Sequence, residues 1–343
     1  MTILGIETSC DDTAIAILKI RGKKFEILSN VVASQVNLHQ KYGGVYPTLA
    51  KREHQKNLPI VLEKALKKTK NPKIDLIAVT IGPGLEPCLW TGINFAKDLS
   101  KKWKLPLIPI NHIEAHIFAN FVGKEPKTNF FPAICLVVSG GHTQLILMKN
   151  IGSYKIIGET RDDAAGECFD KTARILGLEY PGGPAIAKQV KKLKNTNYKL
   201  ITNLPRPMIH QKNYDFSFSG LKTAVLYDFK SRPEKVRKSK LYIKEMCNEI
   251  QQAIIDVLIS KTLKAAKDFK AKTIILGGGV SANNELRKQF KVYSLESKVE
   301  FLVPPKKLCT DNAVMIATSA YFYWLKNKEL KPETIEANAN LRL

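Results

Sequence analysis

The sequence contains no C-x-x-C pair and no apolar run long enough to span a membrane, although it has six cysteines and is 44% hydrophobic. Scattered cysteines indicate neither a disulfide framework nor a zinc knuckle. The first residues carry Glu7 and Asp11 and no basic stretch, so we expect no signal peptide. These absences predict a cytoplasmic protein with no membrane contact. A chain of 343 residues suffices for one large or two medium domains.

Acidic residues are scarce, because 31 Asp and Glu stand against 54 Lys and Arg, a net charge of +23. Only 9 of the basic residues are arginine, so part of the excess is a general lysine bias. The charge is nevertheless concentrated, since residues 188–240 hold 14 basic and 3 acidic residues. Aromatic residues are interleaved with them, among them Tyr198, Tyr214, Phe216 and Phe218. A solvated lysine face and a polyanion-binding surface both explain this segment, and the concentration favours the second.

The pattern of apolar runs repeats along the chain. Three short strands, a helix, and then strand–helix–strand–helix are predicted within residues 1–122 and again within 131–325. The basic segment, about 188–240, is an insertion in the second copy, and residues 326–343 form a tail. A helix over Leu49–Lys68 is expected to break or kink at Pro59. We therefore predict an α/β fold with two duplicated lobes around a cleft.

Two histidines lie four residues apart in the otherwise apolar stretch "INHIEAHIFA". In a helix this spacing directs His112 and His116 to one side, where two imidazoles can chelate one metal ion. Two partly buried histidines on an apolar face are the alternative. The pattern is not the H-E-x-x-H of metalloproteases, because Glu114 lies two residues after His112 and on another side of the helix.

A third metal ligand is expected, because zinc or iron held by two histidines usually has a carboxylate as well. Asp311, in "CTDNAVM", is the candidate, since it lies at a predicted strand-to-helix junction of the second lobe. The alternative role of this aspartate is to cap the following helix.

Three polar or glycine-rich loops lie at equivalent points of the two lobes: "ETSCDDT", "VSGGHT" and "GGGVSAN". Glycine turns allow a backbone to approach a phosphate closely, and a helix N-terminus favours an anion. Together the loops indicate a nucleotide site.

Eight stretches together resemble the TsaD family, the bacterial-type tRNA N6-adenosine threonylcarbamoyltransferases. They are "GIETSCDDTAIAI", "GPGL", "NHIEAH", "VSGGHTQL", "DDAAGECFDKTARILGLEYPGGP", "FSFSGLKTA", "GGGVSANNELR" and "CTDNAVMIA". The resemblance covers nearly the whole chain. It implies the duplicated actin/Hsp70/sugar-kinase-like (ASKHA) fold. It also implies transfer of a threonylcarbamoyl group from threonylcarbamoyl-AMP to N6 of the adenosine adjacent to the anticodon in ANN-reading tRNAs.

The resemblance implies roles for particular residues. One divalent metal per subunit, iron or zinc, would be held by His112, His116 and Asp311. Asp11 and Asp12 would lie near the transferred group, and one of them would orient or deprotonate the attacking amine. The adenylate would contact Val138, Ser139, Gly140, Gly141, His142, Asp170, Gly183 and Asn283.

The chain departs from the family pattern in three places. Many members have glutamate in place of Asp12, so this carboxylate has a shorter reach. Archaeal and eukaryotic relatives have a tyrosine ligand where this chain has Val137, which favours three protein ligands with open positions for substrate or water. No role follows for Glu86 and Pro87.

Three other functions compete with this one. A sugar-kinase-like enzyme would use the same nucleotide loops without needing the two histidines and Asp311. The geometry of Glu114 disfavours a metalloprotease. A non-enzymatic RNA-binding scaffold explains the basic segment but leaves the cleft residues without a task.

The resemblance further implies tRNA as a substrate and two protein partners, a TsaB-like paralogue and a TsaE-like ATPase. The helix over 49–68 has an apolar stripe that either docks a partner or packs on the chain's own sheet. The stripe consists of Leu58, Val61, Leu62, Ala65 and Leu66. In the basic segment we expect aromatic rings to stack on unpaired bases and cations to contact tRNA phosphates. These cations are Lys191, Lys192, Lys194, Arg232, Lys235, Arg237 and Lys238.

Overall fold

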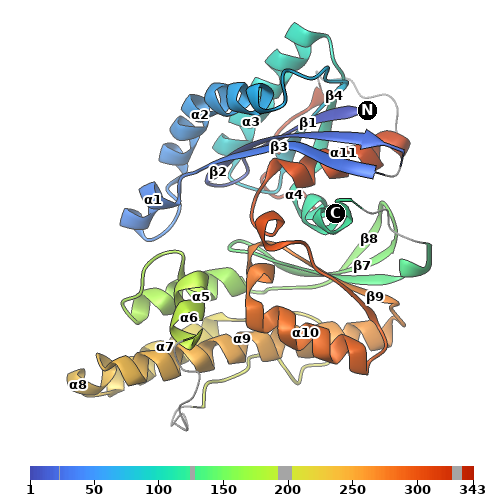
Figure 1. The fold of residues 1–343 in the computed structure, drawn as a ribbon. Helices are drawn as coiled ribbons and strands as arrows, with labels where there is room; N and C mark the ends of the chain where they lie inside the picture. The colour runs from blue at the N-terminus through green and yellow to red at the C-terminus, as the bar shows by residue number, and fades with distance from the viewer. Residues whose placement is uncertain (23, 124–127, 192–202, 327–333) are drawn as a thin grey trace. The chain divides into compact units, whose positions relative to one another are not determined.

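The computed structural model describes every residue except 23, 124–127, 192–202 and 327–333 (Figure 1). The chain forms two compact units, residues 1–127 with 304–343 and residues 128–303, here called unit 1 and unit 2. The predicted boundary differs from this one. Residues 304–325, assigned above to the second lobe, belong to unit 1 because helix α11 (Ala313–Lys326) packs on strands of the first sheet.

Unit 1 contains a five-stranded mixed sheet in the order β3-β2-β1-β4-β5. The central strand β1 pairs antiparallel with β2 and parallel with β4, and it is fully buried. The strands are β1 (Thr2–Glu7), β2 (Asp12–Arg21), β3 (Lys24–Ser34), β4 (Leu76–Gly82) and β5 (Leu107–Asn111). Short turns connect β1 to β2 and β2 to β3. Strands β4 and β5 each follow a helical crossover, as parallel pairing requires.

Helices cover both faces of this sheet. Helices α2 (Pro47–Lys68) and α3 (Glu86–Trp103) pack on one face, and α11 with α4 (His112–Phe118) packs on the other (Figure 1). The short elements of unit 1 are α1 (Val36–His39) and the 3-10 turns η1 (Gln40–Tyr42), η2 (Ala119–Phe121) and η5 (Lys306–Leu308).

The apolar stripe of α2 lies in the core of unit 1. Leu58, Val61 and Ala65 are buried there, and Leu62 and Leu66 pack against the same cluster. The stripe therefore packs on the chain's own sheet, and the prediction that it docks a partner is wrong. Of the two outcomes predicted at Pro59, a break or a kink, the break does not occur, because α2 is one helix of 22 residues with this proline inside it.

Unit 2 repeats the topology of unit 1, with the strand order β10-β9-β6-β7-β8. Strand β6 corresponds to β1, since it pairs antiparallel with β7 and parallel with β9. The strands are β6 (Ala133–Val138), β7 (Thr143–Asn150), β8 (Ser153–Glu159), β9 (Thr273–Gly277) and β10 (Glu300–Leu302). The same order and the same mixture of pairings confirm the predicted duplicated α/β architecture.

The helices of unit 2 build its core against one face of the sheet. They are α5 (Ala165–Ile175), α6 (Gly182–Lys191), α7 (Ser219–Ser231), α9 (Lys240–Asp268) and α10 (Asn284–Glu296). The short helix α8 (Glu234–Arg237), which has no buried residue, and the 3-10 turns η3 (Thr128–Phe130) and η4 (Gly279–Ala282) complete the unit. No helix within the described ranges is both long and apolar enough to cross a membrane.

Phe216 and Phe218 of the basic segment belong to this core, and Tyr214 packs against it. Phe216 and Phe218 are fully buried and stack on each other with ring centroids 6.3 Å apart. The Tyr214 hydroxyl donates a hydrogen bond to Asp268, 2.7 Å away. Tyr198 lies outside the described residues. The prediction that Phe216 and Phe218 stack on RNA bases is therefore wrong.

Candidate functional site

The candidate metal centre lies in unit 1, at the carboxyl ends of β1, β4 and β5. Strand β5 ends at Asn111, whose side-chain oxygen accepts hydrogen bonds from the backbone N–H groups of Ile113 and Glu114 at 2.8 and 3.1 Å. This cap starts α4 at His112. His112 and His116 therefore lie one turn apart on the same side of the helix, as the spacing predicts.

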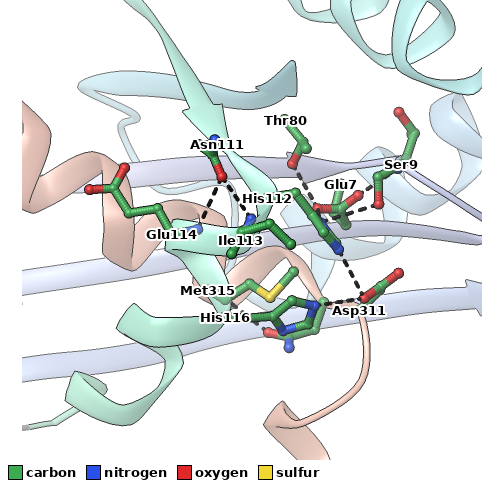
Figure 2. A network of polar contacts seen from close by, with 12 residues as sticks. Glu7, Ser9, Thr80, Asn111, His112, Ile113, Glu114, His116, Asp311 and Met315 are labelled. Carbon is green, nitrogen blue, oxygen red and sulfur yellow. Dashed lines mark hydrogen bonds and ion pairs between the residues drawn. The ribbon is translucent and has the colours of Figure 1, made fainter. Parts of the chain in front are cut away.

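The structure brings the two histidines together with Asp311. The Asp311 Oδ1 atom lies 3.2 Å from His116 Nε2 and 3.6 Å from His112 Nε2 (Figure 2). One ligand atom from each of the three residues lies within 4.8 Å of the others. Both histidines are buried. This group could hold a metal ion, and the Glu114 side chain points away from it.

Asp311 is not the cap of α11. The neighbouring Asn312 has that task, since its Oδ1 accepts from the backbone N–H groups of Val314 and Met315 at 3.1 and 3.2 Å. The alternative role predicted for Asp311 is thereby excluded. Its carboxylate faces the two imidazoles instead.

Glu7, at the end of β1, is a site residue that sequence reasoning missed. Its carboxylate is fully buried and lies 3.1 Å from His112 Nδ1, while the Thr80 hydroxyl donates to it at 2.7 Å. The backbone N–H of Ser9 also donates to Glu7. A carboxylate that accepts Nδ1–H from a histidine fixes the ring and leaves Nε2 free to bind a metal. The signal in the sequence was a single acidic residue at the end of an apolar strand.

The electrostatics of this centre favour a cation. Burial lowers the pKa of His112, but the charges of Glu7 and Asp311 outweigh this effect and raise the pKa to about 9. Burial lowers the pKa of His116, so this imidazole is neutral at neutral pH. Its Nε2 atom faces Asp311, whereas its Nδ1 atom is buried and has no hydrogen-bond partner among the described residues. Two buried histidine rings and two nearby carboxylates fit a bound zinc or iron ion.

Two further carboxylates follow Glu7 in the turn between β1 and β2. Burial raises the pKa of Asp12 to about 7, and the charges of Asp311 and Asp11 add to this rise. Burial also raises the pKa of Asp11, again with a contribution from Asp311. Asp11 Oδ2 and Asp12 Oδ1 are buried without a hydrogen-bond partner in the described part of the chain. Both carboxylates are therefore more basic than a solvated aspartate.

The His54 side chain of α2 holds this turn in place. His54 Nε2 donates to the carbonyl of Cys10 at 2.9 Å, and Nδ1 accepts from the Thr13 hydroxyl at 2.8 Å. Burial lowers the pKa of His54, so the ring is neutral and both bonds are kept at neutral pH. Helix α2 thus holds the turn at two points, at Cys10 before the two aspartates and at Thr13 after them.

The predicted adenylate residues lie in unit 2, most of them after the carboxyl ends of β6 and β9, with Asp170 on α5 and Gly183 on α6. The turn from Val138 to His142 is closed by a hydrogen bond from Ser139 N to the His142 carbonyl at 2.8 Å. A Cβ atom on either Gly140 or Gly141 would meet nothing within 4 Å, so the backbone of this turn is open. Helix α5 begins beside it, since Gly166 N donates to the Ser139 carbonyl at 3.1 Å.

The loop after β9 approaches the same turn closely. A Cβ atom on Gly278 would lie 2.4 Å from the Val138 carbonyl oxygen, and its φ of +84° also favours glycine. Asn283 caps α10, and its amide donates to Gln251 at 2.8 Å. Asp170 accepts from the Gly182 N–H at 2.7 Å, next to Gly183. Asn283 and Asp170 thus both have structural tasks.

The cations of the basic segment are partly paired. Arg232 lies 2.9 Å from Asp228, and Lys238 lies 2.6 Å from Glu234. The Arg237 guanidinium lies over the Phe229 ring. Lys192 and Lys194 lie outside the described residues.

Comparison with known proteins agrees with this geometry. Residues 26–318 match the model of the TsaD family, described as tRNA N6-adenosine threonylcarbamoyltransferase. A protein of that name from Thermosipho africanus (strain TCF52B) is 47% identical over 345 aligned positions and is covered completely, as is this chain. Another, from Syntrophomonas wolfei subsp. wolfei, is 45% identical over 341 positions, which cover 99% of this chain and 97% of the relative.

Among solved structures, full-length HypF in its phosphate- and nucleotide-bound form matches with a TM-score of 0.58 and 13% identity. The match covers 95% of this chain and 56% of the HypF chain, so this chain spans about half the length of that protein. At this identity the likeness concerns the fold alone. Together with the two repeated sheets, it confirms the predicted ASKHA fold.

Proposed function

The chain belongs to the TsaD family of tRNA N6-adenosine threonylcarbamoyltransferases, and from this premise we propose which residues carry the reaction. It is a transferase that acts on tRNA. The donor is threonylcarbamoyl-AMP, and the acceptor is the N6 amine of the adenosine adjacent to the anticodon in ANN-reading tRNAs. One observation carries the proposal, the group formed by His112, His116 and Asp311. The charge of its aspartate also raises the pKa of Asp11 and of Asp12.

His112, His116 and Asp311 hold one divalent metal ion per subunit, iron or zinc. When bound, such an ion supplies Lewis-acid polarisation of a carbonyl or phosphate oxygen. The chain's own contribution is to fix the ligand atoms. Glu7 orients His112, Asn111 starts the helix that carries both histidines, and Asn312 starts the helix that follows Asp311.

The transfer exchanges one bond at the carbamoyl carbon. The N6 amine attacks this carbon and a C–N bond forms, while the C–O bond to the phosphate breaks and AMP leaves with the bonding electron pair. The amine must lose a proton, which Asp12 accepts. A base with a pKa of about 7 suits this step, because about half of it is ionised at neutral pH and the ionised form still binds a proton well. Asp11 orients the amine beside it.

The donor's adenylate binds to the loops of unit 2. The turn Val138, Ser139, Gly140, Gly141 and His142 takes the phosphate through the backbone at its two glycines, and the open space around them supports this role. Asp170 on α5, Gly183 in the first turn of α6 and Asn283 at the start of α10 contribute to ribose and base binding.

The protein acts in the cytoplasm with two partners, a TsaB-like paralogue and a TsaE-like ATPase. Since the apolar stripe of α2 is buried, a partner that contacts this helix must use its outward face, where Ile60 is exposed.

Incubation of the protein with threonylcarbamoyl-AMP and an ANN-reading tRNA, with and without a chelator, tests the proposal. We expect the modified nucleoside to form, and to be lost on chelation and restored by added iron or zinc. Formation of the same amount after complete removal of metal would contradict the role of the three ligands. A large loss of thermal stability on chelation would instead indicate a structural metal.

A further inference from the structure

Two exposed tyrosines lie face to face on the loop that joins β3 to α2. The Tyr42 and Tyr46 ring centroids are 5.7 Å apart and the rings are inclined by only 24°. Tyr42 is 62% exposed and Tyr46 is 54% exposed. Large aromatic rings exposed to this extent are unusual, because burying such a ring stabilises a protein. The reaction described above assigns them no task.

The loop that carries these rings is held by buried hydrogen bonds. Gln35 N donates to the Asp11 carbonyl at 3.1 Å, and the Gln35 amide oxygen lies 3.1 Å from His39 Nε2. His39 Nδ1 in turn accepts from Tyr46 N at 3.2 Å. Both Gln35 and His39 are buried. The tyrosine pair is therefore connected by three successive hydrogen bonds to the turn that carries Asp11 and Asp12.

The surroundings of the pair are positively charged. Lys41, Lys51 and Arg52 are exposed, and no acidic residue occurs between residues 27 and 52. Exposed aromatic rings among cations are the combination that binds unpaired nucleotides, because bases stack on the rings while cations neutralise the phosphates.

We infer that Tyr42 and Tyr46 form a stacking surface for unpaired bases of the tRNA anticodon loop, with Lys41, Lys51 and Arg52 at the flanking phosphates. The inference rests on the proposed function in one respect, that tRNA is the substrate. A loop base seated on this pair would lie on the segment that is bonded to Asp11. The surface would thus place the single-stranded loop next to the carboxylates that act on its adenosine.

A binding experiment with two RNAs tests this surface. The probes are a tRNA anticodon stem-loop and a fully paired duplex with the same number of phosphates. In the double variant Tyr42→Ala/Tyr46→Ala, we expect the affinity for the stem-loop to fall by roughly tenfold per lost ring. The affinity for the duplex should change less than twofold. The variant Tyr42→Phe/Tyr46→Phe should bind both RNAs as the wild type does, because phenylalanine keeps the stacking face.

Two controls make the result specific. Tyr293→Ala removes a tyrosine that is 41% exposed on α10, and it should leave both affinities unchanged. The salt dependence should be the same in the double alanine variant and the wild type, whereas Lys41→Gln should reduce its log–log slope by about one.

An unchanged stem-loop affinity, or an equal loss for both RNAs, overturns the inference. The inference also fails if the alanine variant binds the stem-loop normally but no longer associates with the TsaB-like paralogue, because the surface would then bind protein. Failure of the wild type to modify tRNA would contradict the proposed function instead, and the binding comparison would still decide the role of the tyrosines.

Discussion

The two halves of the molecule share one topology but use different chemistry at equivalent strand ends. After β1, unit 1 places three carboxylates within six residues, Glu7, Asp11 and Asp12, and after β5 it adds two histidines. After β6, unit 2 places Ser139 and two glycines in a turn closed by backbone hydrogen bonds. The strand following its second crossover, β10, corresponds to β5 and leads to Val303 and Pro304, which cannot bind a metal.

This difference separates two tasks. Unit 1 concentrates ionisable groups whose pKa values are shifted by burial and by one another, as acid–base and metal chemistry require. Unit 2 offers backbone N–H groups in an uncharged turn, as phosphate binding requires. A duplicated fold supplies the same scaffold twice, and the loops decide what each copy does. Substitutions at equivalent places should therefore have effects of different kinds.

The largest effect is expected from removing a metal ligand in unit 1. In His112→Ala or Asp311→Ala, bound metal should fall to background and the transfer rate by more than about a hundredfold, because one of only three protein ligands is lost. Elemental analysis and a modified-nucleoside assay measure the two effects, and far-UV circular dichroism checks the fold. Unchanged metal content in both variants would show that the ligands are assigned wrongly.

The Asp12→Asn variant tests the base. The rate should fall by about a hundredfold, because proton transfer by a positioned group contributes at least that much. In the wild type, the rate should rise with pH until Asp12 is ionised, with a midpoint near its pKa of about 7. A wild-type profile that is flat between pH 5.5 and 8.5 would argue against this role of Asp12.

Stability should respond in the opposite sense. The pKa of Asp12 is about 7 in the folded chain and near 3.8 when the chain is unfolded. Stability is therefore lost as pH rises from about 4 to about 7, since the unfolded chain gives up its proton first. Asp12→Asn removes this loss and should be more stable than the wild type at pH 8, by about 2 kcal/mol after allowance for partial solvent exposure. The two proteins should be equally stable at pH 3.5, and denaturant unfolding at both pH values measures the difference.

The sequence predicted local features well and the partners of buried groups poorly. The spacing of His112 and His116 places both on one side of a helix, so this part of the metal centre could be predicted from the local sequence alone. Glu7 did not, because only the folded sheet shows that its carboxylate meets a histidine 105 positions away. Phe216 and Phe218 alternate with polar residues, and this pattern does not reveal that the alternating face lies in a core.

The place of α11 illustrates a second limit. Its residues follow the last strand of the second copy, so the order of elements assigned them to that lobe. In the structure α11 packs on β1, where Gly5 leaves room for it, since a Cβ atom there would lie 2.4 Å from the Ala313 carbonyl oxygen. A glycine in a buried strand was the available signal, but it does not name the helix that approaches. Asp311 reaches the histidines because of this packing.

A smaller effect is expected when Glu7 is replaced and the three ligands are kept. Glu7→Gln removes the charge that orients His112, and metal affinity should fall about tenfold to a hundredfold, as for other partners of metal-binding histidines. Titration with a competing chelator measures the affinity without relying on activity. Glu114→Gln, on the far side of the same helix, is the matched control and should bind metal like the wild type. Equal affinities in all three proteins would reduce Glu7 to a structural residue.

The corresponding change in unit 2 should affect the donor and spare the metal. Gly166→Ala adds a Cβ atom 2.4 Å from the Ser139 carbonyl oxygen, which must shift the turn from Ser139 to His142. We expect KM for threonylcarbamoyl-AMP to rise about fivefold, since moving oriented backbone groups weakens phosphate binding. Metal content should stay at the wild-type level. Loss of metal in this variant would show that the two halves do not divide their tasks as proposed.

The smallest effect is expected from the basic segment of unit 2, where two of the predicted cations are already paired with carboxylates. Lys191→Gln and Lys235→Gln, both at exposed positions, should each weaken tRNA binding only a few-fold. The log–log slope of affinity against salt should become flatter by about one for each lost phosphate contact. Metal content should be unaffected, because these lysines lie in unit 2 and the ligands in unit 1. Fluorescence anisotropy of labelled tRNA between 50 and 300 mM salt measures the slope.

Lys288→Gln on α10, outside the segment, is the control. An identical slope in all three variants and the wild type would identify residues 188–240 as a solvated lysine face, and the tRNA contacts would then have to come from other cations, such as those around Tyr42 and Tyr46.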